Sequence, residues 1–584
     1  MAIKSTYIVA IAAIVVVAAG VGGYMYYQNM QKEALKQERY QRWVEWSRTL
    51  YVGTTSATLH PDIQVGYGGV DRGVIHLQSA KLLYPDFTEM GEFQPYIADS
   101  WEMKKNAAGE WYIEYKLKQG LTFHDGEELT SEAVKYSWER EAWDLFNRTV
   151  AQETHHKWWH ETSWKRLETP DDLTFWQFMP DEAPTYLPHP LAAMHLTQHS
   201  FLVGPESTEM YCKENDPVDL AVKQAGIGPF KLVEWLSDER VVLEAWEDMF
   251  ENPIPHQPTK ATGIDKVVFI LYDDATTLRM ALEKGEIDVV HNTLRRADVG
   301  DLQENPDIVV EITKGVGYTR HLEFNVRPEF YPLNDTRVRK AMAYAIFPDE
   351  IIEKCLFGIG TRADSQVHPW MKYYYPAQYE LYRTGTPEER IAKAKELLAE
   401  AGFPDGFKAD FWFSAGGSAE EYRDMATVLQ AQLKKIGIEL ELKQIESGVF
   451  TDLRNSGKIP MSFQNWCPDY ADPDTDLFYC LHPESRYLPL YTGYNNTEIG
   501  RLIDLGKELF DPAGDPPERE QVYIEIQKIA ADEVPGVWLF HDDIWNAYRS
   551  WVKDFSFFPY TYMCPAWDAR KEIPSNWETT EPPR

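Results

Sequence analysis

The feature that most constrains the fold is a strand–helix–strand pattern that occurs twice, far apart in the chain. The first copy has a strand candidate, a helix candidate and a short strand at residues 267–272, 274–284 and 288–290. The second copy has the same order at residues 409–413, 419–435 and 438–445. A strand, a helix and a second strand in this order usually build a parallel sheet. Since the chain has 584 residues and a domain holds about 100–200, we expect two separate α/β lobes.

A helix between the two copies has clear ends in the sequence. Thr386 can cap it, Pro387 suits its first turn, and Glu389 completes a capping box. Apolar residues then recur at helical spacing until Gly402 and Pro404, which end the helix. The chain has no solenoid repeat and no low-complexity linker, so the lobes should form one body.

The strong negative charge excludes two kinds of partner. Asp and Glu number 92 against 58 Lys and Arg, which leaves a net charge of −34. Nucleic-acid binding needs a basic surface that displaces counterions from phosphates. Docking on anionic lipid through a polybasic patch needs positive charge as well. We therefore expect no nucleic-acid partner.

The first residues of the chain predict a membrane helix. Residues 5–31 carry no charge, and about 20 apolar residues span a bilayer, so a helix at 7–27 suffices. A polar helix or stalk follows at 28–46. The alternative is a cleaved signal peptide, which the small residues at 18–23 permit. Basic residues at Lys4 and between 32 and 42 flank both sides, and the positive-inside rule alone would place the body in the cytoplasm.

The sequence contains no established catalytic or cofactor motif. It has no GxSxG, no P-loop and no HExxH. His155, His156 and His160 could ligate a metal, but they also fit a polar surface segment. The acidic run at 469–476 lacks the glycine and the glutamate of an EF-hand, so a loop of Asx turns explains it more simply. We expect no cofactor and no resident metal.

The cysteines suggest at most one disulfide in the second lobe. There are five, and none forms a CxxC motif. Cys467 and Cys480 are close enough in sequence to bridge a loop if the domain lies outside the cell. The sequence leaves their state open.

Five segments, found in a fixed order, carry a specific resemblance. They are IADSWEM from Ile97, LKQGLTFHDGEELTSEAVKYSWER from Leu117, GIGPFKLVEW from Gly226, LNDTRVRKAMAYAI from Leu333 and NWCPDYADPD from Asn465. Together they resemble the extracellular solute-binding proteins of peptide-type ABC importers, the oligopeptide- and dipeptide-binding family. The resemblance covers roughly residues 50–567. It departs from the family where Ile227 replaces a threonine and where Phe347 and Pro348 replace an Asp-Arg pair.

The resemblance implies an α/β, bilobal periplasmic-binding-protein type II-like fold with an extra subdomain in lobe I, preceded by the N-terminal transmembrane helix. The expected divisions are a membrane anchor and stalk at 1–46, lobe I at 47–325 with the subdomain at about 65–200, lobe II at 326–534, and a return to lobe I at 535–584. The chain would cross between lobes near 324–325 and 535–536. Such proteins trap ligand by lobe closure and deliver it to a membrane permease. They work outside the membrane, so we expect an extracytoplasmic body in spite of the charge count.

The resemblance also implies a ligand site between the lobes. In peptide-binding members, the aspartate of a Trp-x-x-Asp segment faces the amino terminus of the ligand, and the matching residue here is Asp469. A carboxylate opposite an ammonium avoids an unpaired charge in a closed site. The alternative is that Asp469 is only a turn residue. The other ligand-binding candidates are Trp466, Cys467 and Tyr470 beside it, Thr54, Thr55 and Ser56 after the first strand, Tyr318, Arg320 and His321 before the lobe crossing, and Ser414 and Gly416. Strand alternation lets only some of the residues at 318–321 face the ligand.

The loop that holds Ser414 and Gly416 bears on the class of ligand. Dipeptide-binding members carry an arginine in this loop, whereas this chain reads FSAGGSAEE. A small neutral loop lacks the bidentate grip on a ligand carboxylate, which favours oligopeptides over dipeptides. Oligosaccharides, which some members bind by stacking on aromatic rings, would suit the 20 tryptophans.

Alternatives from other classes are weaker. A nickel-chelate carrier of the same family has only the histidines near His155 in its favour. A surface glycan hydrolase would use paired carboxylates, but no motif supports it. A receptor that has lost its permease would need a signalling partner. We therefore expect a binding protein without catalysis.

Overall fold

The structure is a computed structural model of the chain. It describes residues 2–583 apart from 56–61, 65–68, 86–92, 145–162, 182–185, 189–190, 192–200, 215–221, 255–256, 291–293, 417–418, 486, 512–513 and 556–565. Ser56 and the histidines at 155, 156 and 160 therefore lie outside the described residues.

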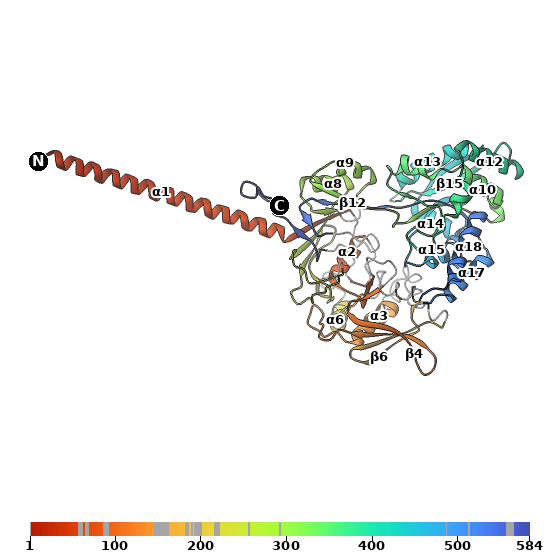
Figure 1. Ribbon diagram of the computed structural model, residues 1–584, viewed down its shortest axis with the longest axis horizontal. Helices are drawn as coiled ribbons and strands as arrows, with labels where there is room; N and C mark the ends of the chain where they lie inside the picture. Colours follow the sequence, from red (N-terminus) through yellow and green to blue (C-terminus); the bar gives the residue numbers. More distant parts are fainter. Residues whose placement is uncertain are drawn as a thin grey trace.

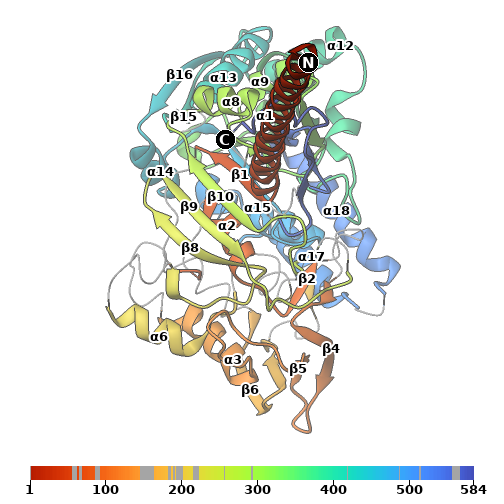
Figure 2. The ribbon, with the colours of Figure 1, turned by 90° about the vertical axis from the view of Figure 1, so that its left-hand side faces the viewer.

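The first large sheet has seven strands in the order β12–β19–β11–β1–β10–β9–β8, and Figure 2 shows β1, β10, β9 and β8 side by side. Helix α8 (Ala275–Lys284) joins β10 to β11, and these two strands flank β1 in parallel. The first predicted strand–helix–strand unit is thus confirmed. The strands are β1 (Thr49–Thr54), β8 (Phe230–Leu236), β9 (Arg240–Ala245), β10 (Lys266–Leu271), β11 (Val289–Val290), β12 (Ile308–Thr313) and β19 (Ile544–Arg549).

The second large sheet has six strands in the order β14–β18–β13–β17–β15–β16. Helix α13 (Ala419–Lys434) joins β15 to β16, which pair in parallel, so the second predicted unit is confirmed too. The strands are β13 (Thr319–Phe324), β14 (Thr361–Arg362), β15 (Lys408–Ser414), β16 (Glu439–Ile445), β17 (Met461–Trp466) and β18 (Gly536–His541). The helices of this part of the chain are α10 (Thr336–Ala345), α11 (Pro348–Cys355), α12 (Pro387–Glu400), α14 (Ser447–Asn455), α15 (Pro473–Leu481), α16 (Leu488–Thr492), α17 (Thr497–Glu508) and α18 (Pro517–Glu533).

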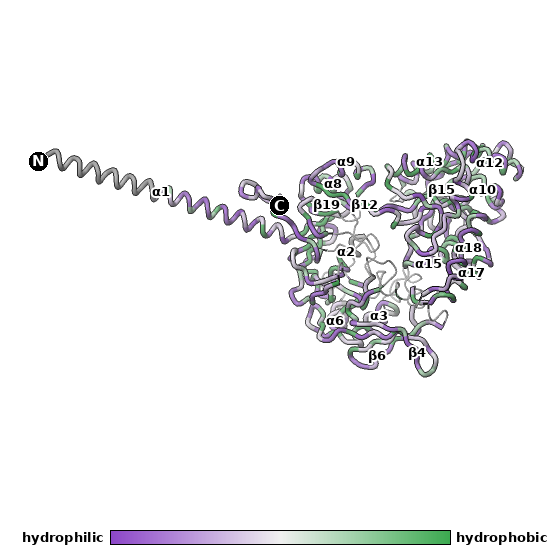
Figure 3. Tube along the Cα trace, viewed as in Figure 1, coloured by the Kyte–Doolittle hydropathy of each residue, from purple (hydrophilic) through white to green (hydrophobic). Residues whose placement is uncertain are grey.

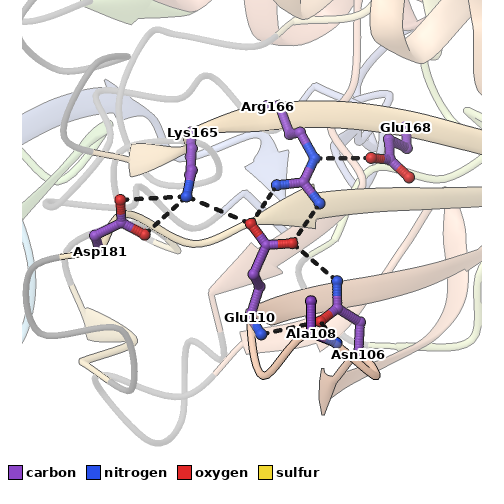
Figure 4. A network of polar contacts seen from close by, with 7 residues as sticks. All are labelled: Asn106, Ala108, Glu110, Lys165, Arg166, Glu168 and Asp181. Carbon is purple, nitrogen blue, oxygen red and sulfur yellow. Dashed lines mark hydrogen bonds and ion pairs between the residues drawn. The ribbon is translucent and has the colours of Figure 1, made fainter.

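A four-stranded antiparallel sheet, β4–β5–β7–β6, lies within the range expected for the extra subdomain. Figure 4 shows how the turn between β4 and β5 is tied to β6: Glu110 accepts hydrogen bonds from both terminal nitrogens of Arg166, at 2.8 and 2.9 Å, and from Asn106 at 2.9 Å. Arg166, followed by Asn106, lowers the pKa of Glu110 to about 2. The helices and strands between residues 69 and 214 are α2 (Gly69–Gln78), β2 (Leu83–Pro85), β3 (Phe93–Pro95), β4 (Ala98–Lys105), β5 (Trp111–Leu117), α3 (Ser131–Glu139), β6 (Arg166–Asp171), β7 (Thr174–Phe178) and α6 (Pro205–Glu214).

Each large sheet has its own apolar core. Leu50, Phe230 and Val267 are buried in one cluster with side chains of the four-stranded sheet. Phe324 and Phe463 are buried in another cluster that belongs to the six-stranded sheet. Separate cores are what two lobes require, because each lobe must bury its own sheet face.

Strand pairing determines where the chain passes from one sheet to the other. It leaves the first sheet after β12 and enters the second at β13, and it returns between β18 and β19. The changes of sheet thus lie at 314–318, before β13, and at 542–543, after β18. The crossings predicted at 324–325 and 535–536 lie at the other end of each of these two strands. The physical reason is that β13 and β18 pair with each other, and strand partners cannot be read from either strand alone.

The chain begins with a single helix, α1 (Ala2–Ser47), of 46 residues, which projects from the body in Figure 1. A helix had been expected here at 7–27 and at 28–46. Its outer part, residues 2–22, lies outside the residues whose side chains are described, and Figure 3 draws it in grey. Within the described part of the chain, no helix combines the length and the apolar character needed to cross a membrane.

Cys467 and Cys480 are not joined to each other. Cys480 is buried in α15, and the Sγ of Cys467 lies 3.8 Å from the carbonyl oxygen of Pro468. The disulfide that the sequence left open is therefore absent from this structure.

Candidate functional site

Most of the predicted ligand residues lie at one edge of the six-stranded sheet. Strands β15 and β17 are parallel neighbours, so Ser414 and Trp466, their last residues, end at the same edge. Strand β13 is antiparallel to β17 and pairs Thr319 with Trp466, so Tyr318 and Arg320 lie at this edge as well. The carboxyl ends of parallel strands are a common place for ligands in α/β proteins. The fold thus gathers residues from three distant segments.

Trp466 lies among aromatic rings. Its ring stacks on Tyr479 with centroids 4.3 Å apart and contacts Tyr487 at 4.9 Å. Its Nε1 is buried and has no hydrogen-bond partner among the described residues. The side chain remains partly exposed, so this ring can offer an apolar surface to a ligand.

Asp469 lies three residues after β17, in the loop before α15, and is half-buried. Its backbone N–H donates to the Thr475 hydroxyl at 3.0 Å, which fixes the loop, and its Oδ2 is buried. Neighbouring Tyr470 is buried and donates to Asp474 at 2.6 Å, and burial raises the pKa of Tyr470 well above its usual value. The loop therefore holds the Asp469 carboxylate in a defined place.

Asp472 and Asp476, further along the acidic run, also have partners within the chain. Asp472 caps α15 by accepting from the Asp474 N–H at 3.0 Å, and it receives Arg519 at 2.8 and 2.9 Å. Asp476 pairs with His368 at 3.1 Å. Burial raises the pKa of Asp472 and of Asp476, against the opposing effects of Arg519 and His368. The run is a buried polar network with an Asx turn, and among the described residues no group of side chains suits a metal ion.

The Arg320 guanidinium contacts the Asp542 carboxylate and the Tyr422 hydroxyl. Its Nε lies 2.8 Å from Asp542 and its terminal nitrogen donates to the Tyr422 hydroxyl at 2.7 Å. Burial works against its charge, but Asp542 and Tyr422 outweigh burial and raise the pKa of Arg320 above its usual value. Asn465 also donates to the Tyr422 hydroxyl, at 3.4 Å. Tyr422 in α13, Asn465 in β17 and Asp542 after β18 thus join this edge, and only the folded structure reveals them.

His321 and Tyr318 differ in their surroundings. His321 is fully buried and packs edge-on against Trp538 with centroids 5.0 Å apart. Burial lowers the pKa of His321 to about 3, so it is neutral at ordinary pH. Tyr318 is half-buried, and the Arg320 guanidinium lies 5.6 Å from its ring. His321 thus lies within β13 in the core, whereas Tyr318 precedes the strand and lies nearer the surface.

Ser414 and Gly416 form a tight polar turn with Ser447. The hydroxyls of Ser414 and Ser447 lie 3.0 Å apart, and the Gly416 N–H donates to Ser414 at 3.1 Å. A Cβ at Gly416 would come within 2.7 Å of the Ser447 oxygen, so a larger residue here would displace the Ser447 hydroxyl. This part of the edge is small and uncharged.

Thr54 and Thr55 lie in the other large sheet, at the carboxyl end of β1. Thr54 is buried, and its carbonyl accepts from the Tyr272 N–H at 2.9 Å; Thr55 is half-buried. They lie at a strand end of the seven-stranded sheet, within the range predicted for lobe I.

Tyr186 links the two parts of the molecule. It lies in the range expected for the extra subdomain, yet its hydroxyl donates to Asp472 at 3.1 Å and its ring contacts Phe510 at 5.4 Å. Burial raises its pKa well above the usual value for a tyrosine. No local signal in the sequence could have identified Tyr186, because its partners are distant in the chain.

Comparisons with known proteins identify the family of this chain. Residues 92–487 match the family described as Bacterial extracellular solute-binding proteins, family 5 Middle. The dipeptide-binding protein of Escherichia coli is 26% identical over 489 residues, which cover 80% of this chain and 84% of that protein. Heme-binding protein A of Haemophilus influenzae is 24% identical over 483 residues, 81% of this chain and 83% of that protein.

Two solved structures have a similar fold. The periplasmic binding protein DppA from Helicobacter pylori, in complex with the peptide STSA, covers 90% of this chain and 98% of its own, with a TM-score of 0.66 and 24% identity. HbpA2 from Haemophilus parasuis covers 90% of this chain and 100% of its own, with a TM-score of 0.72 and 21% identity. The family match spans more than half of the chain. The protein therefore belongs to the family 5 bacterial extracellular solute-binding proteins, which are binding proteins and not enzymes.

Proposed function

We propose that this chain captures oligopeptides outside the membrane, between two hinged lobes, and passes them to the permease of an ABC importer. Family membership supports the transport role, and relatives with this fold are described as dipeptide- or peptide-binding. Two large sheets support the lobes proposed at 47–325 and 326–534 with a return at 535–584, except that β13 and β18 belong to the six-stranded sheet.

The observation that carries the peptide proposal is the position of Asp469. It is half-buried in a loop that a backbone hydrogen bond to Thr475 holds in place, beside the partly exposed Trp466. We assign Asp469 to the ligand's ammonium group, because a charge-assisted hydrogen bond in a desolvated site is strong and selective.

The small turn at Ser414 and Gly416 supports longer peptides over dipeptides. It offers hydroxyls and a backbone N–H but no guanidinium, so the far end of the ligand would not be gripped by an ion pair there.

The amine anchor is tested by comparing a free peptide with its N-acetylated form on the full chain in detergent. At a hundredfold excess over Kd, a ligand stabilises the folded chain by about 2.7 kcal/mol, so binding is visible as a thermal shift. We expect Asp469→Asn to weaken binding of the free peptide by about 1.5–3 kcal/mol, roughly tenfold to a hundredfold in Kd. Acetylation should weaken binding to the wild type by a similar factor and leave Asp469→Asn almost unaffected.

The matched control is Asp472→Asn, which removes one of the two carboxylates that pair with the buried Arg519 and leaves Asp515. It should lower the melting temperature more than Asp469→Asn does, because a buried guanidinium loses part of its charge compensation. If Asp469→Asn still distinguishes the free from the acetylated peptide, the amine-anchor assignment is wrong. If only oligosaccharides, heme or nickel–histidine shift the melt, the ligand is not a peptide.

We further propose that residues 7–27 anchor the chain in the membrane with the body on the extracytoplasmic side. The uncharged run at 5–31 and the unbroken helix α1 support this. The full chain should remain in membranes after alkaline carbonate extraction, and protease added from outside should digest the body. Release of the intact chain would overturn the anchor, and a mature chain that begins after residue 18 would show a cleaved signal peptide instead.

A further inference from the structure

The inner part of α1 carries a stripe of side chains on one face. Lys36, Arg39, Tyr40, Trp43 and Trp46 follow one another at intervals of three, one, three and three residues, so their side chains share one side of the helix. Trp43 and Trp46 are only 3% and 4% exposed, although the helix projects from the body. Another part of the chain must cover this face.

The segment after β21 (Arg570–Lys571) covers it, and Figure 1 shows the C-terminal end of the chain beside the inner part of α1. Lys36 pairs with Glu578 at 2.8 Å, and Glu581 pairs with Arg39 at 2.9 Å and with Arg42 at 3.1 Å. These contacts join residues more than five hundred positions apart in the sequence.

Aromatic and backbone contacts add to the ion pairs. The Trp43 Nε1 donates to the carbonyl of Thr580 at 3.2 Å. The ring of Tyr40 contacts that of Trp577, with centroids 5.0 Å apart. The tail segment therefore follows the stripe over three turns of the helix, and its contacts are specific in geometry as well as in charge.

The base of the helix is fixed to the seven-stranded sheet. Trp46 packs edge-on against Trp551 at 5.2 Å, and the Lys571 ammonium lies 3.7 Å from the centroid of the Trp46 ring. Lys571 is buried and donates to Asp288 at 2.9 Å and to the carbonyl of Thr49 at 2.9 Å. Because the buried Lys571 ammonium needs both its carboxylate partner and its cation–π contact, the base of α1 has one defined orientation on the sheet.

We propose that residues 571–583 form a clasp that makes α1 a rigid stalk and not a flexible tether. The segment 28–46 contains no glycine or proline, so the helix continues from the clasp to the expected membrane helix. At 1.5 Å per residue, residues 28–42 would hold the body about 20 Å from the bilayer in one orientation. That last consequence rests on the proposed membrane anchor, whereas the clasp itself does not.

The clasp also gives the basic residues of the stalk a role. Lys36, Arg39 and Arg42 flank the expected membrane helix on the side of the body, where the positive-inside rule disfavours them. Each of them has an acidic partner in the clasp. Their presence on this side is therefore explained by folding of the stalk.

The test is limited chymotrypsin digestion of the full chain in detergent, with cleavage after Tyr40 and Trp43 as the readout. We expect Glu578→Lys combined with Glu581→Lys to raise the cleavage rate at these sites at least about tenfold, while the melting temperature of the body stays near that of the wild type. The triple change Lys36→Glu, Arg39→Glu and Arg42→Glu should have the same effect. All five changes together should restore protection, because every ion pair is then re-formed with reversed polarity.

The matched control is Glu38→Lys with Glu45→Lys, two exposed carboxylates on the opposite face of α1, which should leave the cleavage rate unchanged. Two outcomes would overturn the clasp. One is cleavage of the Glu578/Glu581 double variant at the wild-type rate, and the other is a variant with all five changes that is not protected again. Trp577→Ala provides a second readout that does not depend on charge, and it should also raise the rate of cleavage after Tyr40. If carbonate releases the chain from membranes while α1 stays protected from cleavage, the membrane anchor is wrong and the clasp still holds.

Discussion

Glu323 lies in β13, between β17 and β18, and is almost completely buried. Its Oε1 accepts a hydrogen bond from Ser462 at 2.9 Å, and its Oε2 has no hydrogen-bond partner among the described residues. Burial raises the pKa of Glu323 to about 7, although the Ser462 hydrogen bond acts in the opposite direction. A strand residue that is charged in a free peptide at neutral pH thus has a pKa near neutral pH in the folded chain.

This pKa predicts a pH-dependent stability. The folded value lies above the ordinary value of 4.5, so the unfolded chain releases its proton first and the free energy of unfolding falls as pH rises from about 4.5 to about 7. Glu323→Gln is neutral throughout, so at pH 8 it should be more stable than the wild type by up to about 3 kcal/mol. At pH 4.5 the two proteins should have nearly equal stability. Chemical denaturation at both pH values measures the difference, and a difference that does not change with pH would contradict the assignment.

At the scale of elements, local patterns predicted both type and position well. The capping box of α12 is present as expected: Thr386 accepts from the Glu389 N–H at 3.2 Å, and the Glu389 carboxylate accepts from the Thr386 N–H at 2.8 Å. The strand expected at 438–445 is observed as Glu439–Ile445. Such features depend on neighbouring residues, so a single sequence contains what determines them.

Removal of the cap should destabilise the chain by a known amount. Thr386→Ala leaves the Glu389 N–H without its side-chain partner, and we expect a loss of about 1 kcal/mol in the free energy of unfolding. Thr386→Ser keeps the hydroxyl and should lose only a few tenths of that. Urea denaturation of the three proteins distinguishes the cap from a general effect of substitution. Equal losses for alanine and serine would show that the hydroxyl does not act as a cap.

At the scale of the whole molecule, a polar bridge joins the two large sheets. Arg296 begins α9 (Arg296–Gln303), which packs on β12 of the first sheet, while Glu421 lies in α13 of the second. Their side chains pair at 3.2 Å, and Arg296 also contacts Asp542 in the segment that returns to the first sheet. Asp542 in turn holds Arg320 of the ligand edge. The bridge therefore couples the arrangement of the sheets to the candidate site.

We expect the Arg296–Glu421 pair to favour the closed arrangement of the lobes. Glu421→Gln removes one charge of a partly buried pair, and a loss of about 1 kcal/mol in closure should weaken ligand binding roughly fivefold. Glu420→Gln alters the exposed neighbour in the same helix and should leave affinity unchanged. Isothermal titration of the peptide found in the thermal-shift screen gives both values. If Glu421→Gln and Glu420→Gln bind the peptide equally well, the Arg296–Glu421 pair does not contribute to closure of the lobes.

The sequence by itself determined the α/β class, the two strand–helix–strand units, the caps of α12 and, through its resemblance, the family. These depend on local periodicity, on neighbouring residues, or on strings of residues shared with relatives. The role of Asp469 stays a prediction of that resemblance. Only the tertiary structure decided that β13 and β18 pair, that Tyr186 meets Asp472, and that residues 571–583 cover α1. Such contacts join segments hundreds of residues apart, and their free energy depends on burial and charge that no local pattern records. The candidate site combines both origins, because its residue types come from the sequence and their meeting at one sheet edge comes from the fold.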